Sequence, residues 1–396
     1  MNSRSKVFNG FLIVVVLSLL LYLAMISIQP NLSQSTLFSY DVYQEKALSD
    51  SSFRFFWLLG DMTEAQFHKS IFGGLGLLLF AFWGYLLERK NSKWKGFSIS
   101  YGTGLFPWIF ISSLIGLAIS VYLFGANLSE GWIPTFVPFV SVPAAVVLVY
   151  GKGWRNALTG GILGALFTFP VSWLVIKYVL TPIGLPSLVG NVTGMWVGAI
   201  IVLEMCKHLP WMKLPEVKED CEGQAEEAAT SEENKASETK WFIRRVLADF
   251  TEPQFYGNEL ASIGLILGSV LSWVLNPVHP AYGSGVFPAV LFSQFLASAI
   301  GIYTFYDEYE KQGFYPTFIP VVSTAPAIVL MFGGTIQSIL AGAILGALAG
   351  PPLGNFIGSK LPKHWHPVIG NTFSMAVCTL VIAAMLKFMP GFGLPF

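Results

Sequence analysis

The apolar stretches of this chain are too long to cover the surface of a soluble core. The first runs from Val7 to Ile28, and about 20 apolar residues in a helix are enough to cross the hydrocarbon core of a bilayer. Only 12% of the 396 residues are charged, whereas a soluble domain carries about 25%. The sequence therefore predicts an all-α polytopic membrane protein. Ten further spans, for about eleven transmembrane helices in all, are expected near residues 69–88, 104–124, 132–150, 157–180, 189–208, 257–276, 285–306, 315–332, 338–357 and 368–388.

The second half of the chain repeats motifs of the first half in the same order. The motif Asp61–Phe67 (DMTEAQF) returns at Asp249–Phe255 (DFTEPQF), and Tyr101–Pro107 (YGTGLFP) returns at Tyr282–Pro288 (YGSGVFP). The repeated motifs stand 180 to 188 residues apart. A fixed order and a nearly constant offset indicate an internal repeat. We therefore expect an N-terminal transmembrane helix with an external polar segment at 1–50, a five-helix repeat at 51–212, an acidic linker at 213–240 and a second five-helix repeat at 241–396.

An odd number of spans in each repeat orients the two copies oppositely in the membrane. With the N-terminus in the cytoplasm, 18 of the 23 Lys and Arg residues fall on the cytoplasmic side. This bias is the one that the positive-inside rule requires. We therefore expect inverted repeats in a plasma (inner) membrane, with the N-terminus and the linker in the cytoplasm and the C-terminus outside.

Two matching stretches, Gly131–Ser141 (GWIPTFVPFVS) and Gly313–Ser323 (GFYPTFIPVVS), each place two prolines at four-residue spacing. A proline inside a helix costs about 3 kcal/mol or more, because it removes a backbone hydrogen bond and clashes with the preceding turn. Interrupted segments at matching positions of inverted repeats indicate a transporter binding site. The alternative is that these prolines only begin and kink a helix. The predicted substrate-binding residues of the two stretches are Pro134, Thr135, Pro138, Ser141, Pro316, Thr317, Pro320 and Ser323.

Asn191 and Asn371 open the last expected span of each repeat. An Asn at such a position either caps the start of the helix or, if the preceding segment dips into the membrane, faces a substrate. We include both among the predicted substrate-binding residues.

The other repeated motifs have structural explanations. The two Tyr-Gly loops are expected to form tight turns with an interfacial tyrosine. Glycines four residues apart allow two helices to approach closely, and such pairs occur at Gly160 with Gly164 and at Gly342 with Gly346.

Four repeated acids stand just before membrane spans. We expect them to cap amphipathic segments at those points, with a role in gating as the alternative. They are Asp61, Glu64, Asp249 and Glu252.

The sequence contains no catalytic motif of serine hydrolases, zinc proteases or P-loop enzymes, so an enzyme is not expected. A net charge of zero gives no electrostatic reason for nucleic-acid binding. The three cysteines show no paired spacing, and His364 and His366 alone do not make a metal site. No cofactor is predicted beyond a coupling ion, either Na⁺ or H⁺.

These features predict a secondary transporter for a small neutral or zwitterionic solute, bound between the two proline-broken helices. The shortage of charge within the expected spans favours such a solute, and Na⁺ coupling fits better than a carboxylate proton relay. Two alternatives remain open: a passive channel for small solutes on the same scaffold, and a non-transporting assembly or regulatory subunit. The lipid bilayer surrounds the protein in all three cases, and assembly into a homo-oligomer is also open.

Overall fold

The computed structural model describes residues 3–215, 238–362 and 364–393, which form helices and turns and no strands. The first half contains α1 (Ser3–Ile28), α2 (Tyr40–Ser49), α3 (Ser51–Asp61), α4 (Ile71–Arg89), α5 (Phe106–Phe124), α6 (Val142–Tyr150), α7 (Trp154–Val175), α8 (Thr181–Ile183) and α9 (Ser187–His208). The second half contains α11 (Glu238–Asp249), α12 (Glu259–Leu275), α13 (Phe287–Thr304), α14 (Tyr306–Gln312), α15 (Thr324–Phe332), α16 (Ile336–Gly358) and α17 (Val368–Lys387). The predicted linker at 213–240 lies mostly in residues 216–237, outside the described residues.

Eight helices of the described chain are long and apolar enough to cross a membrane. They contain α1, α4, α5, α7, α9, α13, α16 and α17. The all-helical class predicted from the sequence is confirmed, and each of these eight helices falls on an expected span. The other three expected spans coincide with shorter apolar helices at Val137–Tyr150, Glu259–Leu275 and Pro320–Phe332.

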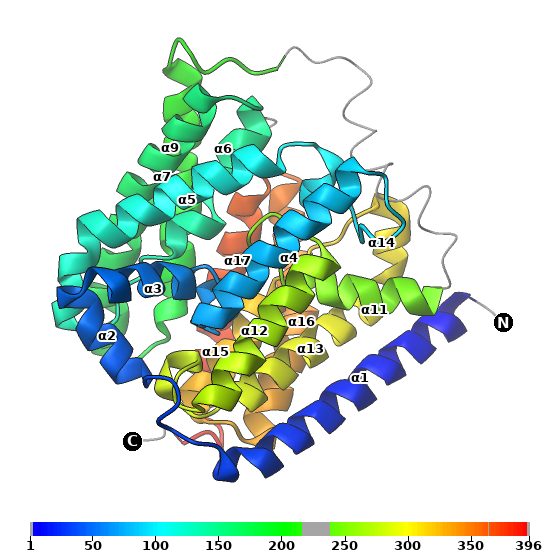
Figure 1. The fold of residues 1–396 in the computed structure, drawn as a ribbon. Helices are drawn as coiled ribbons and strands as arrows, with labels where there is room; N and C mark the ends of the chain where they lie inside the picture. The colour runs from blue at the N-terminus through cyan, green and yellow to red at the C-terminus, as the bar shows by residue number, and fades with distance from the viewer. Residues whose placement is uncertain (1–2, 216–237, 363, 394–396) are drawn as a thin grey trace.

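Helix α1 lies along one side of the molecule, where it packs against α11 and α13 (Figure 1). Its outward face carries large apolar side chains, among them Leu17 at 61% exposure and Leu20 at 57%. A contiguous apolar face of this kind suits contact with lipid, which is as apolar as leucine. The exposure of α1 therefore agrees with a membrane-embedded protein.

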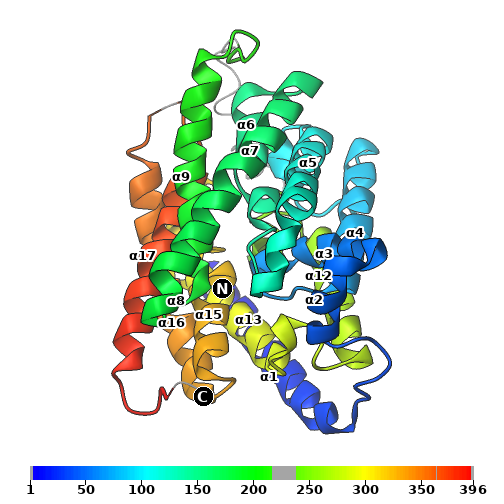
Figure 2. The ribbon, with the colours of Figure 1, turned by 90° about the vertical axis from the view of Figure 1, so that its left-hand side faces the viewer.

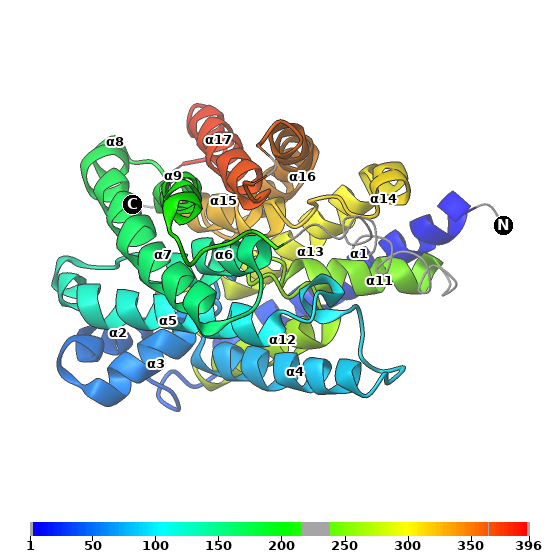
Figure 3. The same ribbon diagram turned by 90° about the horizontal axis from the view of Figure 1, so that it is seen from above.

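Besides the contacts of α1, two helix pairs join the two halves of the chain. Helix α4 packs along α12, and α9 packs against α17 (Figure 2). Seen from above, α4 and α12 lie side by side at one edge of the molecule, and α16 and α17 lie at the opposite edge (Figure 3). Glycine makes the first contact close: a Cβ added to Gly76 would collide with the carbonyl oxygen of Gly264, and a Cβ on Gly264 would collide with that of Gly76. Small residues allow such close approach between apolar helices.

Both proline-containing stretches are non-helical over most of their length. Residues 131–136 and 313–319 form coil and turns, and short 3₁₀ turns at Val137–Val140 and Pro320–Val322 follow them. The backbone breaks at Ser141 and Ser323, where φ is −148° and −140°, before α6 and α15 begin. The expected spans at 132–150 and 315–332 are thus interrupted, and the α-helical parts begin after the paired prolines rather than at them.

The glycine pairs pack as expected, against the broken segment of their own half of the chain. A Cβ on Gly164 of α7 would lie 2.7 Å from Pro143 of α6. In α16 a Cβ on Gly346 would lie 2.9 Å from Thr324 at the start of α15. Each broken segment is therefore held against the long helix that follows it.

Candidate functional site

A cavity of about 860 Å³ is lined by residues from both halves of the chain. Many of the lining residues occupy matching positions in the two sequence repeats. The matching pairs are Glu64 with Glu252, Ala65 with Pro253, Phe67 with Phe255, Tyr101 with Tyr282, Phe136 with Phe318, Val140 with Val322, Leu188 with Val368, Asn191 with Asn371, Val192 with Thr372, and Met195 with Met375. The repeated motifs of the sequence therefore meet at one place.

The cavity opens toward one end of the molecule. Its lining extends to the loop after α4, where Asn91 and Lys93 are exposed, and to Trp241 and Gly313 nearby. Residues 34–47 lie elsewhere and do not line it. They pack instead on the chain after α12, where the Asn276 side chain donates to the carbonyl oxygens of Gln34 and Leu37 at 2.8 and 2.7 Å.

The first carboxylate cluster consists of Asp61, Glu64 and Lys69, each at most 1% exposed. Lys69 Nζ donates to Asp61 Oδ1 and, at 2.6 Å, to Glu64 Oε2. The ammonium also lies 3.5 Å from the ring centre of Trp57, in a cation–π arrangement. Trp132, from the first broken stretch, donates its indole N–H to Glu64 Oε1. Glu64 brings this cluster to the cavity wall.

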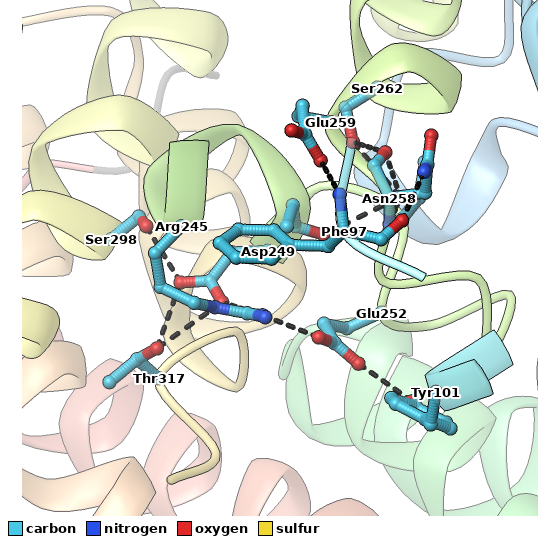
Figure 4. Close-up of polar contacts among 12 residues, drawn as sticks. Phe97, Tyr101, Arg245, Asp249, Glu252, Asn258, Glu259, Ser262, Ser298 and Thr317 are labelled. Atoms are coloured by element: carbon cyan, nitrogen blue, oxygen red, sulfur yellow. Dashed lines mark hydrogen bonds and ion pairs between the residues drawn. The ribbon is translucent and has the colours of Figure 1, made fainter. Parts of the chain in front are cut away.

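The second carboxylate cluster consists of Arg245, Asp249 and Glu252 (Figure 4). Arg245 Nη2 donates to Asp249 Oδ1 at 2.8 Å and to Glu252 Oε1. Asp249 Oδ2 also accepts hydrogen bonds from the hydroxyls of Ser298 at 2.7 Å and Thr317 at 2.9 Å. Arg245 and Glu252 line the cavity, and Asp249 is fully buried behind them.

The Tyr-Gly loops connect each half of the chain to the carboxylate cluster of the other. Tyr101 donates its phenol to Glu252 Oε2 at 2.7 Å, and Tyr282 interacts with Glu64. Both tyrosines hold a left-handed backbone, with φ of 61° and 58°. The expectation of tight turns is correct, but Tyr101 and Tyr282 line the cavity and contact the acids instead of anchoring the chain at the membrane interface.

Two glutamines from the repeated motif pair with each other. Gln66 Nε2 donates to Gln254 Oε1 at 3.0 Å, and Gln254 Nε2 donates to Gln66 Oε1 at 3.1 Å. Each amide also reaches the other half's backbone, Gln66 at Phe250 O (2.5 Å) and Gln254 at Met62 O (2.9 Å). Both side chains are buried, so the two motifs are locked together by four buried hydrogen bonds.

The acids of the repeated motif do not cap helices, and that prediction is wrong. Ser70 caps α4 by accepting the Gly73 N–H at 3.0 Å, and Asn258 caps α12 by accepting the Ala261 N–H at 3.0 Å. Left-handed backbone at Lys69, with φ of 46°, belongs to the turn that carries its side chain back to the acids. The repetition of acids and glutamine at fixed spacing was the one sequence signal of this centre.

Burial changes the acidity of both aspartates, which lie outside the candidate membrane spans. It raises the pKa of Asp249 to about 6, although Arg245 and the hydrogen bond from Ser298 act to lower it. Burial also raises the pKa of Asp61 well above its usual value, against the opposing effect of Lys69. Buried acids with raised pKa values are able to bind a proton near neutral pH.

The predicted prolines and serines of the broken stretches lie behind the cavity wall. All are buried, and none lines the cavity. The Ser141 and Ser323 hydroxyls donate to carbonyl oxygens four residues back, at 2.6 and 2.5 Å, so their donor capacity is used locally. The prolines concerned are Pro134, Pro138, Pro316 and Pro320. From these stretches the cavity receives apolar side chains instead, namely Phe136, Val140, Phe318 and Val322.

The two predicted threonines support the carboxylate clusters. Thr135 Oγ1 accepts a hydrogen bond from the Trp57 indole at 2.9 Å. Thr317 Oγ1 donates to Asp249 and lies 2.8 Å from the phenol oxygen of Tyr309. Both threonines are fully buried, so the structure gives them positioning contacts with the clusters rather than a place on the cavity wall.

Asn191 and Asn371 are the predicted residues that do line the cavity. They stand inside α9 and α17, whose N-cap positions are held by Pro186 and Pro367, so neither asparagine is a cap. Asn191 Oδ1 is buried and has no hydrogen-bond partner among the described residues. This oxygen is available to accept a hydrogen bond from a ligand.

Within residues 3–215, 238–362 and 364–393, no group of three or more His, Cys, Asp or Glu side chains could hold a metal ion. No known family model matches this chain. No curated protein matches it either. Its function is therefore inferred from the cavity, the two carboxylate clusters and the helices around them.

Proposed function

We propose that this protein is a secondary transporter and that the cavity is its binding site for a small neutral or zwitterionic solute. The observation that carries the proposal is a single cavity whose wall is built from matching positions of two sequence repeats. Transporters built from inverted repeats bind their substrates at the interface of those repeats. The cavity opens at one end, while residues 34–47 pack across the chain after α12. One-sided access is what alternating access requires of each resting state.

We further propose one N-terminal helix followed by two inverted five-helix repeats, with about eleven spans in total. Three shorter apolar helices complete this number alongside the eight longer ones. Two contacts join residues to their own repeat partners: Gln66 with Gln254, and Gly76 with Gly264. Such contacts are expected where a two-fold axis relates the two repeats, because residues near the axis meet their own equivalents.

The proposed orientation in the plasma membrane puts the open end of the cavity in the cytoplasm. Lys93 and Lys95 line that end, and short loops rich in Lys and Arg favour the cytoplasmic side. Arg4 pairs with Asp307 at 2.5 Å, which ties the start of α1 to α14. Since Gly313 after α14 lines the same end, the N-terminus belongs to the cytoplasmic side as well.

The chemistry of the wall supports a solute with both donor and acceptor groups. Arg245 presents a cation whose Nε is buried and has no hydrogen-bond partner among the described residues. Asn191 Oδ1 and the carboxylate of Glu64 offer acceptors. A zwitterion would place its carboxylate toward the guanidinium and its ammonium toward these acceptors. Aromatic side chains such as Phe136 and Phe318 supply apolar contact for the rest of the solute.

Uptake into liposomes tests this proposal. Purified protein would be reconstituted and offered a panel of radiolabelled neutral amino acids, sugars and polyols, with and without unlabelled solute inside. We expect saturable uptake of at least one solute and faster uptake when the same solute is present inside. Asn191→Ala should raise the half-saturation concentration about 2- to 10-fold, the worth of one hydrogen bond.

A matched control is Asn31→Ala, because Asn31 is exposed in the turn after α1. This variant should transport like the unmodified protein. Uptake without stimulation by internal solute would instead indicate a passive channel. No uptake of any solute on the panel would contradict the transporter and favour a non-transporting membrane subunit.

A further inference from the structure

Each carboxylate cluster contains two acids and one cation. With both acids ionised, the first cluster carries a net charge of −1, because Lys69 balances one of Asp61 and Glu64. The other titratable groups that act on it are the phenols of Tyr40 and Tyr43 in α2 and of Tyr282. Phenols are neutral at physiological pH, so they leave the excess negative charge in place.

The first cluster is almost completely removed from solvent. Asp61 and Lys69 are 0% exposed, and Glu64 is 1% exposed at the cavity wall. An unpaired charge is costly in such surroundings, and a buried group avoids the cost by changing its protonation state. One bound proton brings the cluster to zero net charge.

The hydrogen bonds indicate where that proton sits. Asp61 Oδ2 is buried and has no hydrogen-bond partner among the described residues, and the Asp61 side chain interacts with that of Glu64. The second cluster differs, because both oxygens of Asp249 and both oxygens of Glu252 accept hydrogen bonds. These donors favour the ionised form of its acids, whereas the first cluster has an oxygen left for a proton.

We propose that Asp61 and Glu64 share a bound proton, carried on Asp61 and donated to Glu64, and that this is the coupling ion of the transporter. The statement about coupling rests on the proposed function, and the statement about the proton does not. A proton as the coupling ion replaces the Na⁺ favoured from the sequence. That preference assumed that no carboxylate pair was buried at the centre of the protein.

The route of the proton follows from which acid lines the cavity. Glu64 reaches the wall, so its carboxylate accepts the proton from solution and becomes a neutral acid. Transfer to Asp61 leaves Glu64 ionised again and makes Asp61 neutral. The cluster has then gained one proton, and its net charge has risen from −1 to 0. Lys69 holds both acids in place by its hydrogen bonds to them. Release reverses the two steps when the cluster faces the opposite side.

Infrared spectroscopy of the full-length protein in liposomes tests the proton without any solute. A protonated carboxyl group gives a C=O stretching band separate from that of a carboxylate. We expect this band near neutral pH in the unmodified protein and its loss in Asp61→Asn. The matched control is Asp41→Asn, at an exposed position of α2, which should leave the band unchanged. Persistence of the whole band in Asp61→Asn would overturn the proposal.

A second measurement, on unmodified protein, tests the proposal even if Asp61→Asn does not fold. Unmodified protein containing aspartate labelled with carbon-13 at the side-chain carboxyl should show the band shifted to lower frequency. A band that does not shift, or no protonated-carboxyl band from acid to neutral pH, would overturn the proposal. These outcomes do not depend on transport, so a bound proton in a protein that takes up no solute would contradict the proposed function alone. Solute uptake without accompanying proton movement would remove the coupling role and leave the proton site standing.

Discussion

The two carboxylate clusters use the same acids and take their cations from different places in the sequence. Lys69 of the first cluster stands eight residues after Asp61, where the second repeat has Gly257. Arg245 of the second cluster stands four residues before Asp249, where the first repeat has Trp57. Both arrangements put one cation between two acids. The two clusters therefore share a positive charge between the two acids, although a different residue type at a different sequence position supplies it.

The two cations also differ in whether they reach the cavity. Lys69 is fully buried and covered by the ring of Trp57. The guanidinium of Arg245 lines the cavity and lies 5.7 Å from the ring centre of Phe314, another lining residue. Arginine stays charged beside a cavity. The first cluster thus keeps its cation behind the cavity wall, whereas the cation of the second cluster lines the cavity.

Removing each cation gives the largest expected effect and tests this contrast directly. Lys69→Met leaves two buried acids without their cation, and we expect a loss of about 3–5 kcal/mol in the free energy of unfolding. Arg245→Met should cost less, because Arg245 lines the cavity and its removal lets water reach the acids, whereas Lys69 does not line the cavity. Denaturant unfolding of both variants in detergent measures the two losses. Equal losses would remove the distinction between a cation behind the cavity wall and one that lines it. Lys46→Met, at an exposed position, serves as the control.

Moving the cation sharpens the comparison further. Lys69→Gly combined with Trp57→Arg gives the first cluster the arrangement of the second, in which Arg and Gly hold these positions. We expect this double variant to regain about 1–3 kcal/mol relative to Lys69→Gly combined with Trp57→Met, because contacting residues couple by about that much. Unfolding measurements on both double variants check it. A Trp57→Arg variant no more stable than its Trp57→Met counterpart would mean that the two clusters are not interchangeable.

The transmembrane helices, the two broken segments and the role of Asn191 and Asn371 in the cavity wall were predictable from the sequence. Apolar length and repeated prolines are features of the local sequence, so the helices and breaks that they predict do not depend on tertiary contacts. The carboxylate clusters were not predictable, since an acid before a span is normally solvated and its burial depends on where Lys69 or Arg245 folds. The Gln66–Gln254 pair joins residues 188 positions apart. Such a contact becomes visible only when the two repeats are placed together in space.

The smallest expected effect is the difference in stability between variants of the two threonines of the broken stretches. Thr317 donates to the carboxylate of Asp249, and a hydrogen bond to a charged group is worth about 1.5–3 kcal/mol. Thr135 accepts from the neutral indole of Trp57, a bond worth about 0.5–1.5 kcal/mol. Thr317→Val should therefore destabilise the protein more than Thr135→Val in denaturant unfolding, since it also leaves a buried carboxylate oxygen with one donor fewer. The reverse order would show that Thr135, beside the first cluster, contributes more to stability, and that the second cluster does not rely on its broken segment.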